Sequence, residues 1–128
     1  MADLTAGALP APMNMMLGLT RLFSPYEFNP FELNPLRDVV RAQFDFERIR
    51  RDCRLKLFIA ATRVRTGKVR LFRTRELDEE ALLASACLPT VHHAVEIDGE
   101  AYWDGGFTAN PAIYPLMYEC ETPDILLV

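Results

Sequence analysis

Five consecutive apolar residues, at positions 57–61, constrain the fold of this chain more than any other feature. A strand with one face in water alternates apolar and polar residues, and this run does not alternate. Such continuity is typical of a strand that is buried on both sides, in a sheet covered by helices. We therefore expect a strand over residues 55–64 in a protein of the α/β class.

Turn residues predict two hairpins. Thr66-Gly67-Lys68 separates the first strand from an expected partner strand at residues 69–74. Asp98-Gly99, a favoured pair for a two-residue type I′ turn, joins expected strands at 95–97 and 101–103. Each of these strands is therefore expected to lie beside the strand that follows it in the chain.

Capping residues predict two helices, over 35–44 and 79–87. Asn34 is a favoured N-cap residue, and Pro35 after it suits the first helical position. Asp78 is the expected N-cap of the second helix, whose acidic first turn suits the positive end of the helix dipole. Both helices therefore have clear start signals.

The remaining segments have weaker signals. We expect a short helix over 14–23, an extended connection over 24–35, a helical turn over 46–50, and a short helix after Pro111 that Pro115 interrupts. Residues 123–128 are expected to form a buried strand. A domain seldom stops in the middle of a strand, so this ending suggests a chain cut from a longer domain.

The composition is that of a globular protein whose charges are unevenly distributed. Half of the 128 residues are hydrophobic and a quarter are charged, which excludes a disordered chain and a collagen-like repeat. Residues 41–75 hold twelve basic and three acidic residues, whereas residues 76–128 hold eleven acidic and no basic ones. This asymmetry fits either a binding patch or two parts of one fold that face each other. The net charge of −4 disfavours a general nucleic-acid binder.

The cysteines and the N-terminus indicate a reducing compartment. Cys53, Cys87 and Cys120 are odd in number and far apart, so neither a disulfide framework nor a zinc site is expected. The N-terminus has no secretory pattern, and its apolar stretch is far short of the ~20 residues of a membrane-spanning helix. We expect a cytoplasmic protein, at most peripheral to a membrane, without a cofactor or a bound metal.

Several candidate groups have better structural than functional explanations. His92 and His93 are neighbours, and neighbours on an extended chain point to opposite sides, so they are poorly placed to share a metal ion. Neither Ser24 nor Ser85 lies in a G-x-S-x-G elbow, and Ser85 suits close packing in a helix. The basic stretch 63–73 could bind RNA or an anionic lipid surface. A solvated hairpin face, or pairing with the acidic C-terminal part, is the better explanation of that stretch.

Asp104-Gly105-Gly106, directly after the expected strand 101–103, is the most suggestive site. Glycine allows a sharp turn of the backbone and the close approach of another segment. An aspartate held beside such a turn suits the edge of an active-site cleft. Taken alone, however, Asp-Gly pairs mostly form ordinary turns.

Taken together and in order, these segments resemble the C-terminal half of a patatin-like phospholipase catalytic domain. The segments are Phe58-Ile59-Ala60-Ala61-Thr62, the turn at 65–68, Ala84-Ser85-Ala86-Cys87-Leu88-Pro89, the hairpin that leads into Asp104-Gly105-Gly106, and Asn110-Pro111. Residues 54–128 carry the resemblance, and residues 1–53 form a helical or irregular lead-in. The whole chain, 1–128, is therefore expected to be one partial patatin-like domain.

The resemblance implies a three-layer α/β domain with a mainly parallel central sheet. It also implies a lipid acyl hydrolase with a Ser–Asp dyad, in which Asp104 is the proton acceptor and Gly105 and Gly106 shape its turn. A serine hydroxyl is a weak nucleophile until a positioned base accepts its proton. The implied partner is a lipid ester substrate and not a nucleic acid.

The nucleophilic serine of this family is missing from the sequence. The family's G-x-S-x-G elbow and its oxyanion glycines, both nearer the N-terminus in the family, do not occur in the 128 residues. We therefore expect a fragment of a serine lipid acyl hydrolase that keeps only the base and is inactive alone. The alternative is a non-catalytic patatin-like remnant that binds an anionic lipid surface or a protein partner.

Overall fold

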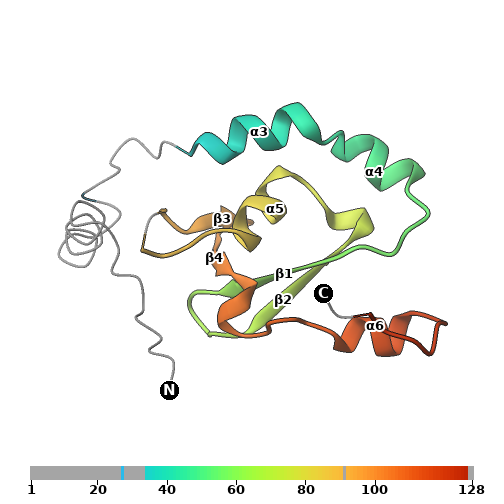
Figure 1. Ribbon diagram of the computed structural model, residues 1–128. Helices are drawn as coiled ribbons and strands as arrows, with labels where there is room; N and C mark the ends of the chain where they lie inside the picture. The colour runs from blue at the N-terminus through green and yellow to red at the C-terminus, as the bar shows by residue number, and fades with distance from the viewer. Residues whose placement is uncertain (1–26, 28–33, 91, 127–128) are drawn as a thin grey trace, which may run out of the picture.

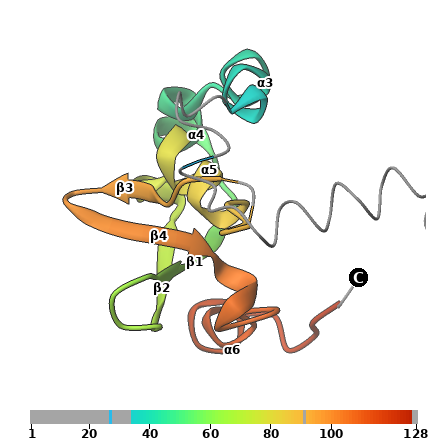
Figure 2. The same cartoon turned by 90° about the vertical axis from the view of Figure 1, so that its left-hand side faces the viewer.

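The computed structural model describes residues 27, 34–90 and 92–126 (Figure 1). Its helices are α3 (Pro35–Gln43), α4 (Phe46–Asp52), α5 (Glu79–Ser85) and α6 (Tyr114–Glu119). Its strands are β1 (Phe58–Arg63), β2 (Val69–Arg73), β3 (Val95–Ile97) and β4 (Glu100–Asp104). Two 3-10 turns, η1 (Thr74–Glu76) and η2 (Gly105–Phe107), follow β2 and β4. Helices α3 and α4 lie at one end of the molecule and α6 lies at the opposite end, with the sheet between them (Figure 1, Figure 2).

The four strands form one sheet in the order β2-β1-β4-β3, and every neighbouring pair is antiparallel. The expected three-layer domain with a mainly parallel sheet is therefore wrong for the described residues, which form a mixed α/β fold. Sharp turns are one reason, because φ is 65° at Gly67, 53° at Asp98 and 78° at Gly99. Such turns reverse the chain into an antiparallel neighbour, whereas a parallel neighbour needs a long crossover.

Both expected hairpins are confirmed, and a third pairing joins them. Strand β1 pairs with β2, and β3 pairs with β4. Strand β1 then pairs with β4, so that Ala61 lies opposite Asp104 and Thr62 lies opposite Trp103. Asp104, the last residue of the second hairpin, therefore lies beside Ala61 of β1, in the first hairpin.

The apolar run at 57–61 leads into and forms most of β1, a central strand of the sheet. In β1 only Ala61 and Thr62 are fully buried, while Phe58, Ile59 and Ala60 are half-buried. The core cluster contains Ala61, Phe72, Leu77, Ala81, Ala84 and Tyr102. The run thus marks a central strand, but the expectation of burial on both sides holds for part of its length only.

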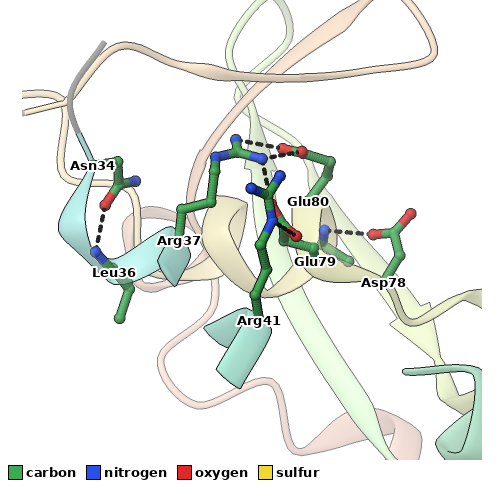
Figure 3. Close-up of polar contacts among 8 residues, drawn as sticks. Asn34, Leu36, Arg37, Arg41, Asp78, Glu79 and Glu80 are labelled. Atoms are coloured by element: carbon green, nitrogen blue, oxygen red, sulfur yellow. Dashed lines mark hydrogen bonds and ion pairs between the residues drawn. The ribbon is translucent and has the colours of Figure 1, made fainter. Parts of the chain in front are cut away.

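Helices α3 and α5 begin where their capping residues predict (Figure 3). The side chain of Asn34 accepts a hydrogen bond from the backbone N–H of Leu36 at 3.1 Å. The side chain of Asp78 accepts one from the N–H of Ala81 at 2.8 Å. Each contact satisfies a backbone donor that has no partner within the helix. Helix α5 ends at Ser85, before its expected end at residue 87.

Charged side chains join α3 to α5 (Figure 3). The guanidinium of Arg37 donates to both carboxylate oxygens of Glu80, at 2.6 and 3.1 Å, and also to Glu79. Arg41 Nε donates to Glu79 Oε2 at 2.7 Å. The side chain of Glu79 is only 19% exposed, whereas that of Arg41 is 60% exposed, so water still screens the Arg41–Glu79 pair in part. A network of this kind stabilises a fold more than an isolated surface ion pair does.

Acidification is expected to weaken the α3–α5 junction. Hydrogen bonding by Arg41 holds the pKa of Glu79 below its ordinary value, against burial and with help from Arg37. The unfolded chain therefore takes up a proton at Glu79 before the folded chain does. The stabilisation is complete above about pH 4.3, the ordinary pKa of glutamate, and is lost as the pH falls through the folded pKa.

Urea denaturation of the wild type and of Glu79→Gln, followed between about pH 3 and pH 7, measures this effect. As the pH is lowered, the unfolding free energy of the variant is expected to fall less than that of the wild type. Glu121→Gln, at an exposed position, is the control and is expected to behave as the wild type does. An identical pH dependence in the wild type and Glu79→Gln would contradict the prediction.

Two expectations near the C-terminus are wrong. Pro115 does not interrupt a helix but lies in the first turn of α6, where its missing N–H breaks no helical hydrogen bond. Residues 123–126 form no strand and are exposed, with Leu126 at 88%. Pro123 has no N–H to donate to a sheet, and none of the described strands pairs with this segment.

Some expectations fall outside the described residues. These are the helix over 14–23, nearly all of the connection over 24–35, and the end of the final strand at 127–128. Within the ranges 34–90 and 92–126, none of the helices is long and apolar enough to span a membrane.

Ion pairs connect the basic middle of the chain to its acidic C-terminal part. Arg63 and Arg65 lie 3.7 and 2.6 Å from the carboxylate of Glu100 on β4. Arg73 lies 2.6 Å from the carboxylate of Glu119 on α6 and lowers its pKa. At these places the two parts face each other, as one of the two interpretations of the charge pattern predicts.

Candidate functional site

Asp104 is the last residue of β4 and the N-cap of η2. The residue is half-buried, and its Oδ1 accepts a hydrogen bond from the N–H of Gly106 at 2.6 Å. A hydrogen bond to a charged acceptor is stronger than one between neutral groups. The N–H of Asp104 donates to the carbonyl oxygen of Cys87 at 2.9 Å. The backbone and the carboxylate of Asp104 are therefore both held.

Gly105 is buried against the central strand β1. A Cβ placed on Gly105 would lie 2.3 Å from the carbonyl oxygen of Ala60 and 2.7 Å from its Cβ. No side chain fits there, so the close approach of two backbones requires glycine at this position. Gly106 is exposed, and a Cβ there would lie 3.0 Å from Asp104 Oδ1. The two glycines thus differ: the first permits packing and the second donates to the carboxylate.

Two threonines that the sequence analysis did not select lie beside Asp104. Thr62 Oγ1 donates to the backbone carbonyl of Asp104 at 2.8 Å and lies 3.0 Å from Thr108 Oγ1. Thr108 Oγ1 also lies 3.0 Å from the carbonyl oxygen of Gly67, in the β1–β2 turn. Thr62 is only 4% exposed. Its place directly after an apolar run was the available signal, because a buried hydroxyl needs a hydrogen-bond partner.

His92 and His93 lie at a different place, a cavity of about 370 Å³ that residues of α3, α5 and β3 also line. Arg37 and Glu80 line this cavity, and Asp104 does not. In the part of the chain that the structure describes, no group of three or more His, Cys, Asp or Glu residues could hold a metal ion. The structure therefore does not bring the histidines and Asp104 into one site.

Comparison with models of protein families identifies the family of this chain. The model of the patatin-like phospholipases matches residues 4–117. The chain belongs to the patatin-like phospholipase family. The match includes positions 104–106, and it begins within the segment 1–53 that the sequence analysis treated as a lead-in. No curated protein and no solved structure matches the chain.

Membership of the patatin-like phospholipase family implies a resemblance to lipid acyl hydrolases. In this patatin-like chain, one carboxylate oxygen of Asp104 is held by Gly106. The other, Oδ2, makes no hydrogen bond to any described residue. A carboxylate with one fixed and one unused oxygen can accept a proton from a neighbouring hydroxyl.

Ser85 of the patatin-like chain is poorly placed to act as a nucleophile. Its Oγ donates to the backbone carbonyl of Leu82 at 2.7 Å, within the last turn of α5. The residues two before and two after it are Leu83 and Cys87, so the glycines of an elbow are absent. Ser85 therefore fits the packing role that the sequence suggests.

Cys87 lies next to Asp104 through the backbone, and its thiol is a poor nucleophile. The Sγ atom donates to the carbonyl oxygen of His93 at 3.0 Å. Burial raises the pKa of the thiol, a backbone hydrogen bond from Val95 opposes this, and the charge of Asp104 raises the pKa further. The thiolate that nucleophilic attack requires is therefore disfavoured.

Proposed function

We propose that this chain supplies the general base of a serine lipid acyl hydrolase. In this proposal residues 1–128 belong to one patatin-like catalytic domain, residues 54–128 are its C-terminal half, and Asp104 is the proton acceptor of a Ser–Asp dyad. One observation carries it: the carboxylate of Asp104 is held at the end of β4 by the N–H of Gly106, at 2.6 Å. Family membership supports a lipid ester as the substrate class.

In this proposal the chain supplies the general base, and polypeptide outside it supplies the nucleophile. The sequence has no G-x-S-x-G elbow, so the serine would come from outside these 128 residues. The serine oxygen attacks the acyl carbon while Asp104 takes its proton, and backbone N–H groups near the serine stabilise the oxyanion. The protonated Asp104 then gives this proton to the departing alkoxide. In the second half of the reaction, Asp104 takes a proton from the water that attacks the acyl carbon. It returns this proton to the serine oxygen as the acyl–serine bond breaks, which releases the carboxylic acid and restores both groups.

The alternative function, in which a non-catalytic chain binds an anionic surface or a partner, has less support. It would use the basic stretch 63–73. Arg63, Arg65 and Arg73 of that stretch already face carboxylates on β4 and α6. Basic side chains that are paired in this way attract an anionic surface less strongly than free ones do.

The proposal is tested by restoring the missing nucleophile. A segment with the glycine-rich stretch and the G-x-S-x-G elbow of an active patatin-like hydrolase is joined ahead of residue 1, and p-nitrophenyl ester hydrolysis is measured. The chain alone is expected to be inactive and the chimera active. Asp104→Asn is expected to lower the kcat of the chimera at least about 100-fold, since a general base typically contributes this much.

Asp98→Asn is the matched control, because Asp98 is exposed in the β3–β4 turn at the other end of the strand that ends at Asp104. Asparagine tolerates the positive φ of this position, so activity is expected to be unchanged. Fluorophosphonate labelling of the elbow serine shows that the chimera is folded. A labelled, active chimera that is insensitive to Asp104→Asn would contradict the proposal. Ester hydrolysis by the isolated chain that Asp104→Ala abolishes would contradict the expected inactivity.

A further inference from the structure

Two threonine hydroxyls link the backbone carbonyl of Asp104 to the β1–β2 turn through three contacts. Thr62 Oγ1 lies 2.8 Å from the carbonyl oxygen of Asp104 and 3.0 Å from Thr108 Oγ1. Thr108 Oγ1 lies 3.0 Å from the carbonyl oxygen of Gly67. Each hydroxyl carries a single proton, and carbonyl oxygens only accept. Two protons therefore serve three contacts, and only two of the three are hydrogen bonds at one time.

Burial decides where the two protons go. Thr62 is 4% exposed, and its neighbour Asp104 is half-buried at the end of β4. Gly67 and Thr108 are exposed, so water can replace a lost hydrogen bond at the Gly67 carbonyl. A shielded carbonyl left without a donor costs more than an exposed one. The proton of Thr62 is therefore assigned to Asp104, and the proton of Thr108 is shared between Thr62 and Gly67.

We propose that Thr62 and Thr108 are positioning residues for the Asp104 carboxylate. Thr62 holds the carbonyl at the point where β4 ends, and Thr108 supports Thr62 by donating to its oxygen. The turn of η2, in which Gly106 donates to Asp104, begins at that same peptide unit. Without the Thr62 hydroxyl the carbonyl of this peptide unit loses its hydrogen bond from the side chain of β1, and the hydrogen bond between Gly106 and the carboxylate weakens. The importance of this positioning for catalysis rests on the role proposed for Asp104.

Hydrogen exchange of the Gly106 amide in the isolated chain tests the proposal without any enzymatic activity. Thr62→Val keeps the shape of the side chain and removes its hydroxyl. It is expected to speed native-state exchange at Gly106 about 10-fold, because the amide loses most of the benefit of its hydrogen bond. Thr62→Ser restores the hydroxyl and is expected to restore slow exchange.

Thr74→Val is the matched control for a general loss of stability. The Thr74 hydroxyl likewise makes two hydrogen bonds, with the N–H of Leu57 at 2.8 Å and the carbonyl of Leu55 at 3.1 Å. Its loss is expected to destabilise the fold without a selective effect on Gly106. Because ester hydrolysis is not measured, a negative result here leaves the chimera experiment on Asp104 unaffected.

Thr108→Val, at an exposed position, provides a second test if Thr62→Val fails to fold. It is expected to speed exchange at Gly106 by a smaller factor, about 3-fold, because a hydroxyl that no longer accepts a proton donates less strongly. Unchanged exchange at Gly106 in folded Thr62→Val would overturn the proposal. If only Thr108→Val folds, unchanged exchange in that variant overturns it.

Discussion

Gly105→Ala is expected to lower the free energy of unfolding by about 3 kcal/mol, the upper end of typical overpacking effects. The new Cβ would lie 2.3 Å from the carbonyl oxygen of Ala60 and 2.6 Å from its carbonyl carbon. These are backbone atoms of β1, a strand that is paired on both sides. Neither atom can move away without disturbing the pairing of β1, so the clash cannot be relieved by a side-chain rotation.

Gly106→Ala is the matched control for this substitution. Gly106 is exposed, and the atoms nearest to its new Cβ would be Asp104 Oδ1 at 3.0 Å and the side-chain nitrogen of Asn110 at 3.7 Å. Small side-chain movements can accommodate it, so a loss below about 1 kcal/mol is expected. Urea denaturation followed by circular dichroism compares the two variants. Equal unfolding midpoints for Gly105→Ala and Gly106→Ala would contradict the close approach of Gly105 to β1.

Phe72→Ala is expected to cost about 4 kcal/mol, which is typical for the removal of a buried phenylalanine ring. Phe72 on β2 is 2% exposed. Its ring lies edge-on to that of Tyr102, with centroids 5.9 Å apart, and the guanidinium of Arg70 lies 4.7 Å from its centroid. Truncation would leave a cavity where the Phe72 ring of β2 meets Tyr102 of β4, two strands that are not neighbours in the sheet. It would also remove the contacts of the ring with Tyr102 and Arg70.

Phe107→Ala removes the same side chain from an exposed position. Phe107 is 61% exposed, and its centroid lies 6.5 Å from that of Trp103. Its loss is expected to cost about 0.5 kcal/mol, as is usual for surface substitutions. The measurement is again urea denaturation, with both variants compared at the same pH and salt. A similar loss of stability in the two variants would contradict the placement of Phe72 in the core.

Local chemistry made much of this fold predictable. The Asp98-Gly99 turn appears where the sequence predicts it, because few residue pairs accept positive φ at two successive positions. The start of α3 at Pro35 and the start of α5 after Asp78 follow from side chains that satisfy free N–H groups. These features depend on residues within a few positions of one another.

Features that depend on distant residues were not predictable in the same way. The joining of the two hairpins into one antiparallel sheet depends on pairing between β1 and β4, which no local pattern specifies. A continuous apolar run indicates a central strand but does not determine the direction of its neighbours. Pro115 suits either the interruption or the first turn of a helix, and the neighbouring segments decide between them. Similarly, the role proposed for Thr62 depends on contacts with two residues distant in the sequence, Asp104 and Thr108.

The pairing of β1 with β4 has a consequence for the order in which the protein assembles. Each hairpin closes over a short stretch of chain, whereas Ala61 and Asp104 are brought together from distant positions. Closing the longer loop costs more chain entropy, so we expect the hairpins to form before they join into one sheet. A chain whose hairpins have not joined lacks every contact between Asp104 and β1. The contacts of Asp104 with Ala61 and Thr62 thus exist only in the completed sheet.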